Sequence, residues 1–278
     1  MKKIFDDVSQ KCSEITTKKY STSFSLGISV LDKKLHKPIY SIYGFVRLAD
    51  EIVDSFHEHN KKELLDKYRA DTKQAIAEKI SLNPILNSFQ FVVNKYNIEE
   101  QHINQFLDSM QHDILNTKHN EESYKEYIKG SAEAVGLMCL RVFCNNNNDL
   151  YNELKKYAEV LGSVFQKVNF IRDMDADYNQ LQRVYFPNLN ITDFNNIEKS
   201  KIEDDIEKEF TEAYVGVKKL PKSARKGVLL AYTYYYELFK KIKKTPANRI
   251  LKERIRISNL IKFLLLIKIE IKCRLNLV

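Results

Sequence analysis

Two pairs of aspartates stand four residues apart in this sequence, a spacing that suits the binding of divalent cations. Asp50 and Asp54 form the first pair, in the segment RLADEIVD, and Asp173 and Asp177 form the second, in RDMDADYNQ. Residues four apart lie on one face of a helix, with Cβ atoms about 5–6 Å apart. Two carboxylates so placed repel each other unless a cation neutralises them. Each pair therefore indicates either a solvated helix face or a metal site.

The residues around these aspartates favour the metal site. A single pair of this kind is most often a solvated face, but here the pattern occurs twice, each time in an otherwise apolar helical segment. Arg47 stands three residues before Asp50, and Arg172 directly precedes Asp173. Arginine suits planar, multidentate contact with phosphate. Two such faces across a helical cavity would hold a diphosphate through shared metal ions.

An oxygen-only donor set suits Mg²⁺, with Mn²⁺ as the substitute. Asn169 adds a neutral oxygen four residues before Asp173, on the same predicted face. The four cysteines form no CxxC pair and have no histidine partners at zinc spacing. Hard cations such as Mg²⁺ take oxygen ligands and share them with substrate phosphates. We therefore predict a magnesium site built from Asp50, Asp54, Asn169, Asp173 and Asp177.

The elements that must position these residues are predicted to be helices. The chain of 278 residues has seven Gly and five Pro, against roughly 19 and 14 at average usage. Folds rich in strands and tight turns need more of both residues. No GxGxxG or GxxxxGK[ST] motif occurs, which excludes the common glycine-rich nucleotide loops. An all-α protein is the prediction.

Hydrophobic periodicity predicts one domain over 1–278 with roughly eight to ten helices. Ser81 or Asn83 is expected to cap the helix that Pro84 opens, the asparagine run 145–148 is expected to form a turn, and 184–196 a loop. The expected helices are 39–56, 63–80, 84–96, 98–114, 124–143, 150–174, 198–220, 224–243 and a basic helix after Pro246.

The net charge of +8 is concentrated at the C-terminal end. Residues 249–278 hold eight basic and two acidic residues, a net charge of +6. Such a segment meets nucleic acid or anionic lipid, or is simply a solvated face. The longest apolar run, Phe263 to Ile267, is far too short to span a bilayer, and the first residues do not form a secretory signal. We expect a cytoplasmic protein, either free or attached peripherally to the inner membrane surface.

Four segments resemble the squalene/phytoene synthase family, the trans-isoprenyl diphosphate head-to-head synthases. They are YSTSFSLG from Tyr20, IYGFVRLADEIVD from Ile42, YKEYIKGSAEAVGLM from Tyr124 and FQKVNFIRDMDADYNQLQRVYFP from Phe165. The likeness covers nearly the whole chain and is greatest to bacterial 15-cis-phytoene synthases. The chain departs from the family at Ala176, where a glutamate is common, and at Lys129 and Gly130. The resemblance implies an isoprenoid-synthase-type helical bundle around a central cavity.

The reaction that this resemblance implies is the head-to-head condensation of two geranylgeranyl diphosphates to phytoene in carotenoid biosynthesis. It proceeds through a cyclopropylcarbinyl diphosphate, and both stages expel diphosphate. Metal ions and arginines stabilise the departing charge, while aromatic rings protect the carbocations from water. By resemblance, the catalytic residues are Tyr127, Tyr235, Arg47 and Arg254, and the substrate-binding residues are Ser21, Ser23, Phe24, Tyr43, Gln166, Arg172 and Arg183.

Two alternatives remain open from the sequence. The first is a squalene or dehydrosqualene synthase that acts on farnesyl diphosphate, with NADPH needed only if the product is squalene. The second is a basic helical module that binds nucleic acid or anionic lipid without catalysis, which would leave both aspartate pairs unexplained. We expect a prenyl diphosphate as the partner, and no nucleic acid.

Overall fold

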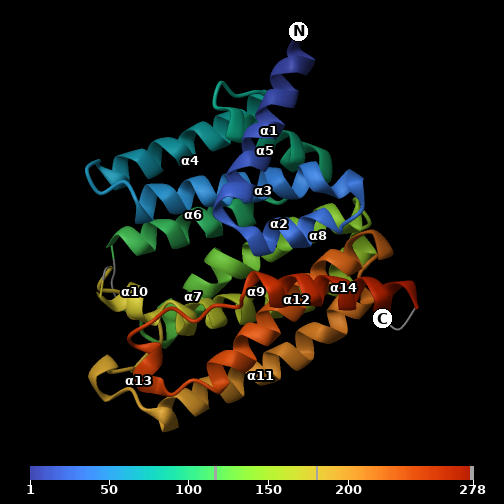
Figure 1. The fold of residues 1–278 in the computed structure, drawn as a ribbon. Helices are drawn as coiled ribbons and strands as arrows, with labels where there is room; N and C mark the ends of the chain where they lie inside the picture. Colours follow the sequence, from blue (N-terminus) through green and yellow to red (C-terminus); the bar gives the residue numbers. More distant parts are fainter. Residues whose placement is uncertain (116–117, 180, 276–278) are drawn as a thin grey trace.

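The computed structural model describes residues 1–115, 118–179 and 181–275, and it confirms the all-α fold class. Across these residues the secondary structure is helical, and a lone β-bridge joins Lys118 to Val184. The helices form two packed groups (Figure 1). Residues of both groups line a cavity between them.

The first group is built around α3, which α1, α4, α5 and α6 surround (Figure 1). Its core contains the fully buried rings of Phe45, Phe89 and Phe106. The Phe45 ring stacks on Phe89 with centroids 3.9 Å apart and lies 5.5 Å from Phe106. The helices of this part of the chain are α1 (Lys2–Tyr20), α2 (Thr22–Ser29), α3 (Lys33–Asp54), α4 (Lys61–Glu78), α5 (Pro84–Tyr96) and α6 (Glu100–Leu115).

The second group is built around α9, which packs against α8, α11 and α12. Val164 and Val168 of α9 meet Phe210 and Phe239 in its core. The helices of this part are α7 (Glu121–Ile128), α8 (Ala134–Cys144), α9 (Asn148–Arg172), α10 (Met174–Asn179), α11 (Asn196–Lys219), α12 (Lys222–Lys243), α13 (Ala247–Ile250) and α14 (Asn259–Arg274), with a 3₁₀ turn at Ile191–Asp193.

Local capping signals in the sequence set several helix ends as expected. The Asn83 side chain accepts hydrogen bonds from the backbone N–H groups of Ile85 and Leu86, so Asn83 rather than Ser81 caps α5. Asn145 and Asn146 take left-handed φ angles of 48° and 65°, which form the predicted turn. Asn147 then caps α9, and the helix begins at Asn148, inside the predicted turn.

Three predictions about the helices are wrong. The described residues hold fourteen α-helices rather than the predicted eight to ten. The difference arises because residues 2–29 form two helices and because the short helices α10 and α13 were not predicted. The helix expected to run to Met174 ends at Arg172, where Asp173 leaves helical geometry with φ −102° and ψ 7°. The basic segment after Pro246 is not one helix, because residues 251–258 run irregularly between α13 and α14 and bury Ile255.

A π-helical turn, Lys129–Glu133, joins α7 to α8 within the predicted helix 124–143. Such turns insert one extra residue and change the direction of the side chains around them. Gly130 lies where a Cβ would come within 2.3 Å of the Gln105 carbonyl oxygen on α6. This close approach leaves no room for a side chain at residue 130, and it brings Ser131 and Ala132 of the π-turn to the cavity wall.

Candidate functional site

The cavity between the two helix groups has a volume of about 950 Å³. Its wall includes every residue that the sequence analysis assigned to the site, contributed by α2, α3, α7, α9, α10, α12 and the segments after α10 and α13. These residues are Ser21, Ser23, Phe24, Tyr43, Arg47, Asp50, Asp54, Tyr127, Gln166, Asn169, Arg172, Asp173, Asp177, Arg183, Tyr235 and Arg254.

The first aspartate pair lies in the last two turns of α3. Asp50 pairs with Arg47, one turn earlier, at 3.9 Å between Nη1 and Oδ2, and Arg47 also pairs with Glu51. Asp54 pairs with Arg183 at 2.9 Å. Arg183 comes from the irregular segment after α10, and only 8% of its surface is exposed.

The second aspartate pair spans the break between α9 and α10. Asp173 caps the C-terminal end of α9, and its carbonyl oxygen still accepts the backbone N–H of Asp177 at 2.9 Å. Two guanidinium groups hold its carboxylate: Arg172 donates from Nε at 2.9 Å, and Arg254 lies 2.7 Å away. Arg254 reaches the site because the segment after α13 is irregular. The break therefore replaces the continuous helical face expected from the spacing.

The two pairs face each other across the polar end of the cavity. Burial and the neighbouring Asp54 carboxylate raise the pKa of Asp50 to about 7. Burial raises the pKa of Asp177 to about 7, and the charges of Asp173 on its own side and Asp54 on the opposite side contribute. Carboxylates that raise one another's pKa form a site of concentrated negative charge, which favours cation binding.

Asp113 is a further carboxylate at this site, and the sequence analysis missed it. It lies near the end of α6, 8% exposed, and accepts hydrogen bonds from Tyr127 at 2.6 Å and Tyr185 at 3.3 Å. Its backbone carbonyl accepts from Arg183 at 3.1 Å. Burial raises the pKa of Asp113 to about 7. The sequence did contain a signal for Asp113: this carboxylate follows Met110 by three residues and so lies on the apolar face of the predicted helix.

The donor chemistry of the site fits Mg²⁺. In the described part of the chain, no three His, Cys, Asp or Glu side chains converge closely enough to enclose a metal ion by themselves. Mg²⁺ is commonly held by one or two carboxylates together with substrate phosphates, and Asp50 with Asp54 and Asp173 with Asp177 supply such donors on both sides. Asn169 was predicted as a fifth metal ligand, but both ends of its amide are hydrogen-bonded to protein groups. Its Oδ1 accepts from the Tyr235 hydroxyl at 3.2 Å, and its Nδ2 donates to Gln166.

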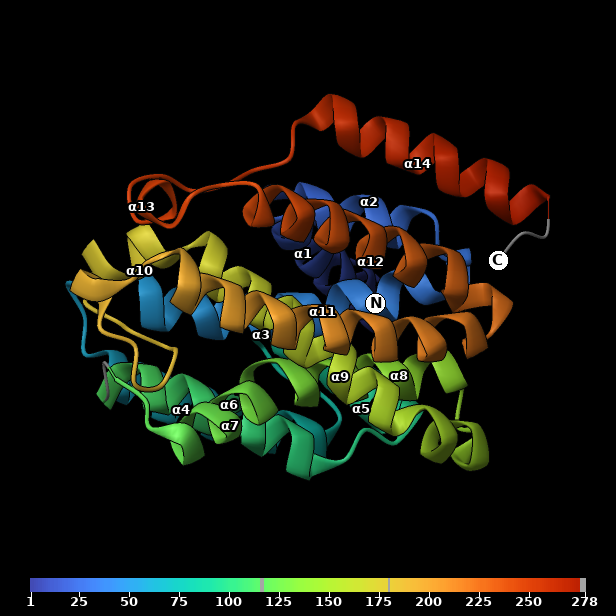
Figure 2. The same cartoon turned by 90° about the horizontal axis from the view of Figure 1, so that it is seen from below.

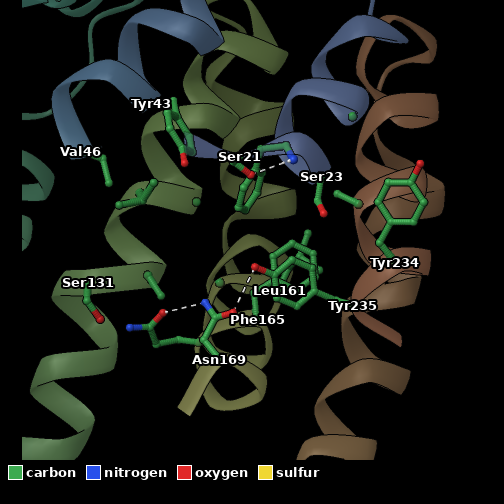
Figure 3. Close-up of a pocket in the computed structure, with 18 of the residues that line it drawn as sticks. Ser21, Ser23, Tyr43, Val46, Ser131, Leu161, Phe165, Asn169, Tyr234 and Tyr235 are labelled. Carbon is green, nitrogen blue, oxygen red and sulfur yellow. Dashed lines mark hydrogen bonds between the residues drawn. The ribbon is translucent and has the colours of Figure 1, made fainter. Parts of the chain in front are cut away.

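Aromatic rings line the cavity beside the polar end. Phe24 lies with its ring centroid 5.8 Å from Tyr43 and 6.2 Å from Tyr235, and Phe165 stacks on Tyr235 at 4.0 Å. Figure 3 shows Tyr235 hydrogen-bonded to Asn169 in this wall. Burial raises the pKa of Tyr43 to about 12, so its hydroxyl stays neutral at physiological pH. Such faces stabilise a cation without offering it a nucleophile.

The rest of the cavity is mainly apolar. Its wall there includes Leu140, Phe143, Leu154, Tyr157, Leu220 and Val228. Ser131, on the π-helical turn, is a polar exception: its hydroxyl is buried and has no hydrogen-bond partner. A cavity with an acidic, arginine-lined end and a long apolar remainder is suited to an amphiphile with a phosphorylated head group.

Fold and site together define a helical protein whose cavity has an acidic, arginine-lined end and a mainly apolar remainder. The chain belongs to the squalene/phytoene synthase family, whose model matches residues 17–260. This match does not support the alternative of an unrelated basic module.

Similar proteins agree with this assignment. The 4,4'-diapophytoene synthase of Staphylococcus haemolyticus is 26% identical over 205 residues, which cover 72% of this chain and 68% of that protein. The chloroplastic phytoene synthase 2 of Solanum lycopersicum is 22% identical over 267 residues, covering 88% of this chain and 84% of that protein. A crystal structure of a dehydrosqualene synthase with a ligand superposes with a TM-score of 0.84 at 20% identity, covering 97% of this chain and 98% of the other.

Proposed function

We propose that this protein condenses two geranylgeranyl diphosphates head to head to form phytoene, in carotenoid biosynthesis. In the first stage, a C–O bond of one substrate breaks, diphosphate leaves, and the allylic cation alkylates the double bond of the second substrate. Loss of a proton closes the cyclopropane. In the second stage, the cyclopropylcarbinyl diphosphate loses its diphosphate, rearranges and loses a second proton. The observation that carries this proposal is the pair of facing aspartate clusters at one end of an apolar cavity.

The side chains of the polar end bind and orient the leaving group. Arg47, Arg172, Arg183 and Arg254 line the cavity and donate multidentate hydrogen bonds to phosphate oxygens. Mg²⁺ held by the four motif aspartates would neutralise charge on the departing diphosphate. The hydroxyls of Ser21 and Ser23 add polar contacts at the start of α2.

The aromatic and apolar walls control the fate of the carbocations. Phe24, Tyr43 and Tyr235 present ring faces beside the reacting carbons, and the apolar wall excludes water that would capture a cation. Tyr127, held by Asp113 through a 2.6 Å hydrogen bond, positions its hydroxyl at the same end of the cavity.

Two observations bear on the length of the prenyl chain. Similarity to the tomato phytoene synthase extends over 88% of this chain, which supports geranylgeranyl diphosphate. The second candidate is farnesyl diphosphate with dehydrosqualene or squalene as product, supported by the diapophytoene synthase and the dehydrosqualene synthase fold. Both candidates use the same polar end. They differ in how much of the apolar wall the chains occupy and, if the product is squalene, in the need for NADPH.

A product assay tests both candidates. Purified protein is incubated with Mg²⁺ and either geranylgeranyl or farnesyl diphosphate, with and without NADPH, and hydrocarbons are identified by mass. We expect a C40 product from geranylgeranyl diphosphate that needs metal but not NADPH. A C30 product alone would establish the second candidate, and the absence of any condensation product from either substrate would overturn the proposal.

A further inference from the structure

Helix α14 lies on the outside of the molecule and packs along α12 (Figure 2). Its inner face is buried, since Leu265 and Ile269 join Leu230 and Tyr234 in a small core. The Tyr234 hydroxyl also donates to the Lys262 carbonyl oxygen at 2.9 Å. The contacts of the inner face therefore suffice to attach α14 to the rest of the protein.

The outer face of α14 is also apolar. Leu260, Leu264, Ile267 and Ile271 follow one another at intervals of four, three and four residues, which places them in one stripe. Their exposures lie between 41% and 67%, and the neighbouring Ile261 and Phe263 are exposed as well. A surface helix of a soluble domain normally presents polar residues outward, and contiguous exposed apolar patches mark interaction surfaces.

The charge around this stripe is positive. Lys268 and Lys272 are exposed on α14 itself, and Arg254 and Arg256 are exposed in the segment leading into it. The two acidic residues nearby are already paired: Glu253 with Arg249 and Glu270 with Lys226 on α12. An apolar stripe flanked by basic residues matches the interface of an anionic lipid layer.

The stripe also begins at the edge of the cavity. Asn259 and Lys262 of α14 line the cavity, and Lys262 donates to the Thr22 hydroxyl of α2 at 3.1 Å. Among the described residues, no helix has the length and apolar character needed to cross a bilayer. A helix lying in the membrane surface is therefore the arrangement that the apolar stripe and the charges suit.

We propose that the outer face of α14 docks this protein onto an anionic lipid bilayer, with Leu264 and Ile267 inserted and Lys268 and Lys272 at the head groups. A second copy of the chain is a poorer occupant, because a two-fold contact would place the same basic residues against each other. This inference does not depend on the reaction proposed above, since it rests only on the surface of α14.

Vesicle sedimentation tests the proposal with the full chain. We expect binding to vesicles of phosphatidylglycerol and phosphatidylcholine that weakens with added salt, and little binding to phosphatidylcholine alone. The double variant Leu264→Glu/Ile267→Glu should lower the partition coefficient by about tenfold or more, because charges replace the inserted side chains. Lys268→Glu/Lys272→Glu should lower it about fivefold per lysine.

The matched control is Leu82→Glu, which alters an apolar side chain that is 93% exposed on the connection before α5. It should bind vesicles like the parent, and circular dichroism checks that every variant is folded. Turnover in detergent should be equal in all of them, which separates this test from that of the reaction. The proposal fails if the parent does not bind anionic vesicles at low salt, or if the α14 variants bind them as well as the parent does. It also fails if light scattering shows that the parent is a dimer and that Leu264→Glu/Ile267→Glu abolishes the dimer.

Discussion

Single residues of the site act through opposite charges held close together. Asp173 lies between the guanidinium groups of Arg172 and Arg254, and Asp54 lies against Arg183. These pairs keep at the cavity wall both the carboxylates proposed to bind cations and the arginines proposed to bind phosphate. The same residues would exchange partners when a metal-bound diphosphate enters, so their charges matter more for turnover than for folding.

Removal of one motif carboxylate should therefore stop the reaction and leave the fold intact. We expect Asp50→Ala or Asp173→Ala to lower kcat by about 100-fold or more, since a group that stabilises leaving-group charge is lost. Asp175→Ala is the matched control, because Asp175 lies between the two motif aspartates but is not part of the cavity wall. Rates come from product formation and helical content from circular dichroism; wild-type rates in Asp50→Ala or Asp173→Ala would contradict the assignment.

The raised carboxylate pKa values predict how stability depends on pH. Asp50, Asp113 and Asp177 each have a pKa of about 7, above the usual value of 3.8. The folded protein thus holds these protons more tightly than the unfolded chain does. This contribution to stability is complete below about pH 4 and is lost as pH rises through 7.

Urea denaturation of the metal-free protein measures this effect. We expect the difference in free energy of unfolding between Asp50→Asn and the parent to increase in favour of the variant from pH 5 to pH 8, because the amide does not ionise. Asp66→Asn, at an exposed aspartate of α4, serves as the control and should keep a constant difference from the parent. A constant difference for Asp50→Asn as well would show that the Asp50 carboxylate does not titrate in this range.

At the scale of secondary structure, close helix contacts set the shape of the cavity. Gly162 of α9 faces the π-helical turn so closely that a Cβ would lie 2.6 Å from the Ala132 carbonyl oxygen. Both residues line the cavity. The π-turn can therefore approach α9 only because residue 162 has no side chain.

A pair of glycine substitutions tests this contact. We expect Gly162→Ala to lower the free energy of unfolding by about 1–3 kcal/mol, since the backbone of the π-turn must shift. Gly27→Ala in α2 should instead be neutral or gain up to about 1 kcal/mol, because its nearest contact would be an ordinary 3.5 Å and alanine favours helix. Thermal and urea unfolding measure both; equal effects would contradict the packing argument.

At the scale of the whole molecule, the cavity exists only when both helix groups are folded together. Its polar end combines α3, α6, α9, α10 and the segment after α13. We therefore expect the predicted single domain, 1–278, to unfold in one transition with equal calorimetric and van't Hoff enthalpies. Two separate transitions in calorimetry would contradict a single domain.

Ligand-dependent stability should depend on metal and phosphate together. The facing carboxylates repel a bare diphosphate, so pyrophosphate in EDTA should leave Tm unchanged. Mg²⁺ and pyrophosphate together should raise Tm, with a gain of about 2.7 kcal/mol at one hundred times Kd. Asp50→Ala and Asp173→Ala should lose the shift, whereas Asp175→Ala should keep it. An equal shift with pyrophosphate in EDTA would contradict the proposed shared metal.

The sequence by itself determined the helical class, most long helices and the residue types of the site. Helical periodicity, caps such as Asn83 and the four-residue aspartate spacing are local properties, so they can be read without knowing the fold. The family motifs then indicated side chains that the structure places around a single cavity.

Tertiary structure alone decided which distant groups meet and in what surroundings. The burial of Asp113, the helix break at Asp173 and the approach of Arg254 all depend on packing between segments far apart in the chain. The unpaired outer stripe of α14 likewise appears only once α12 covers the other face. Local spacing determines which face of a helix a side chain occupies, but only long-range packing determines what that face meets.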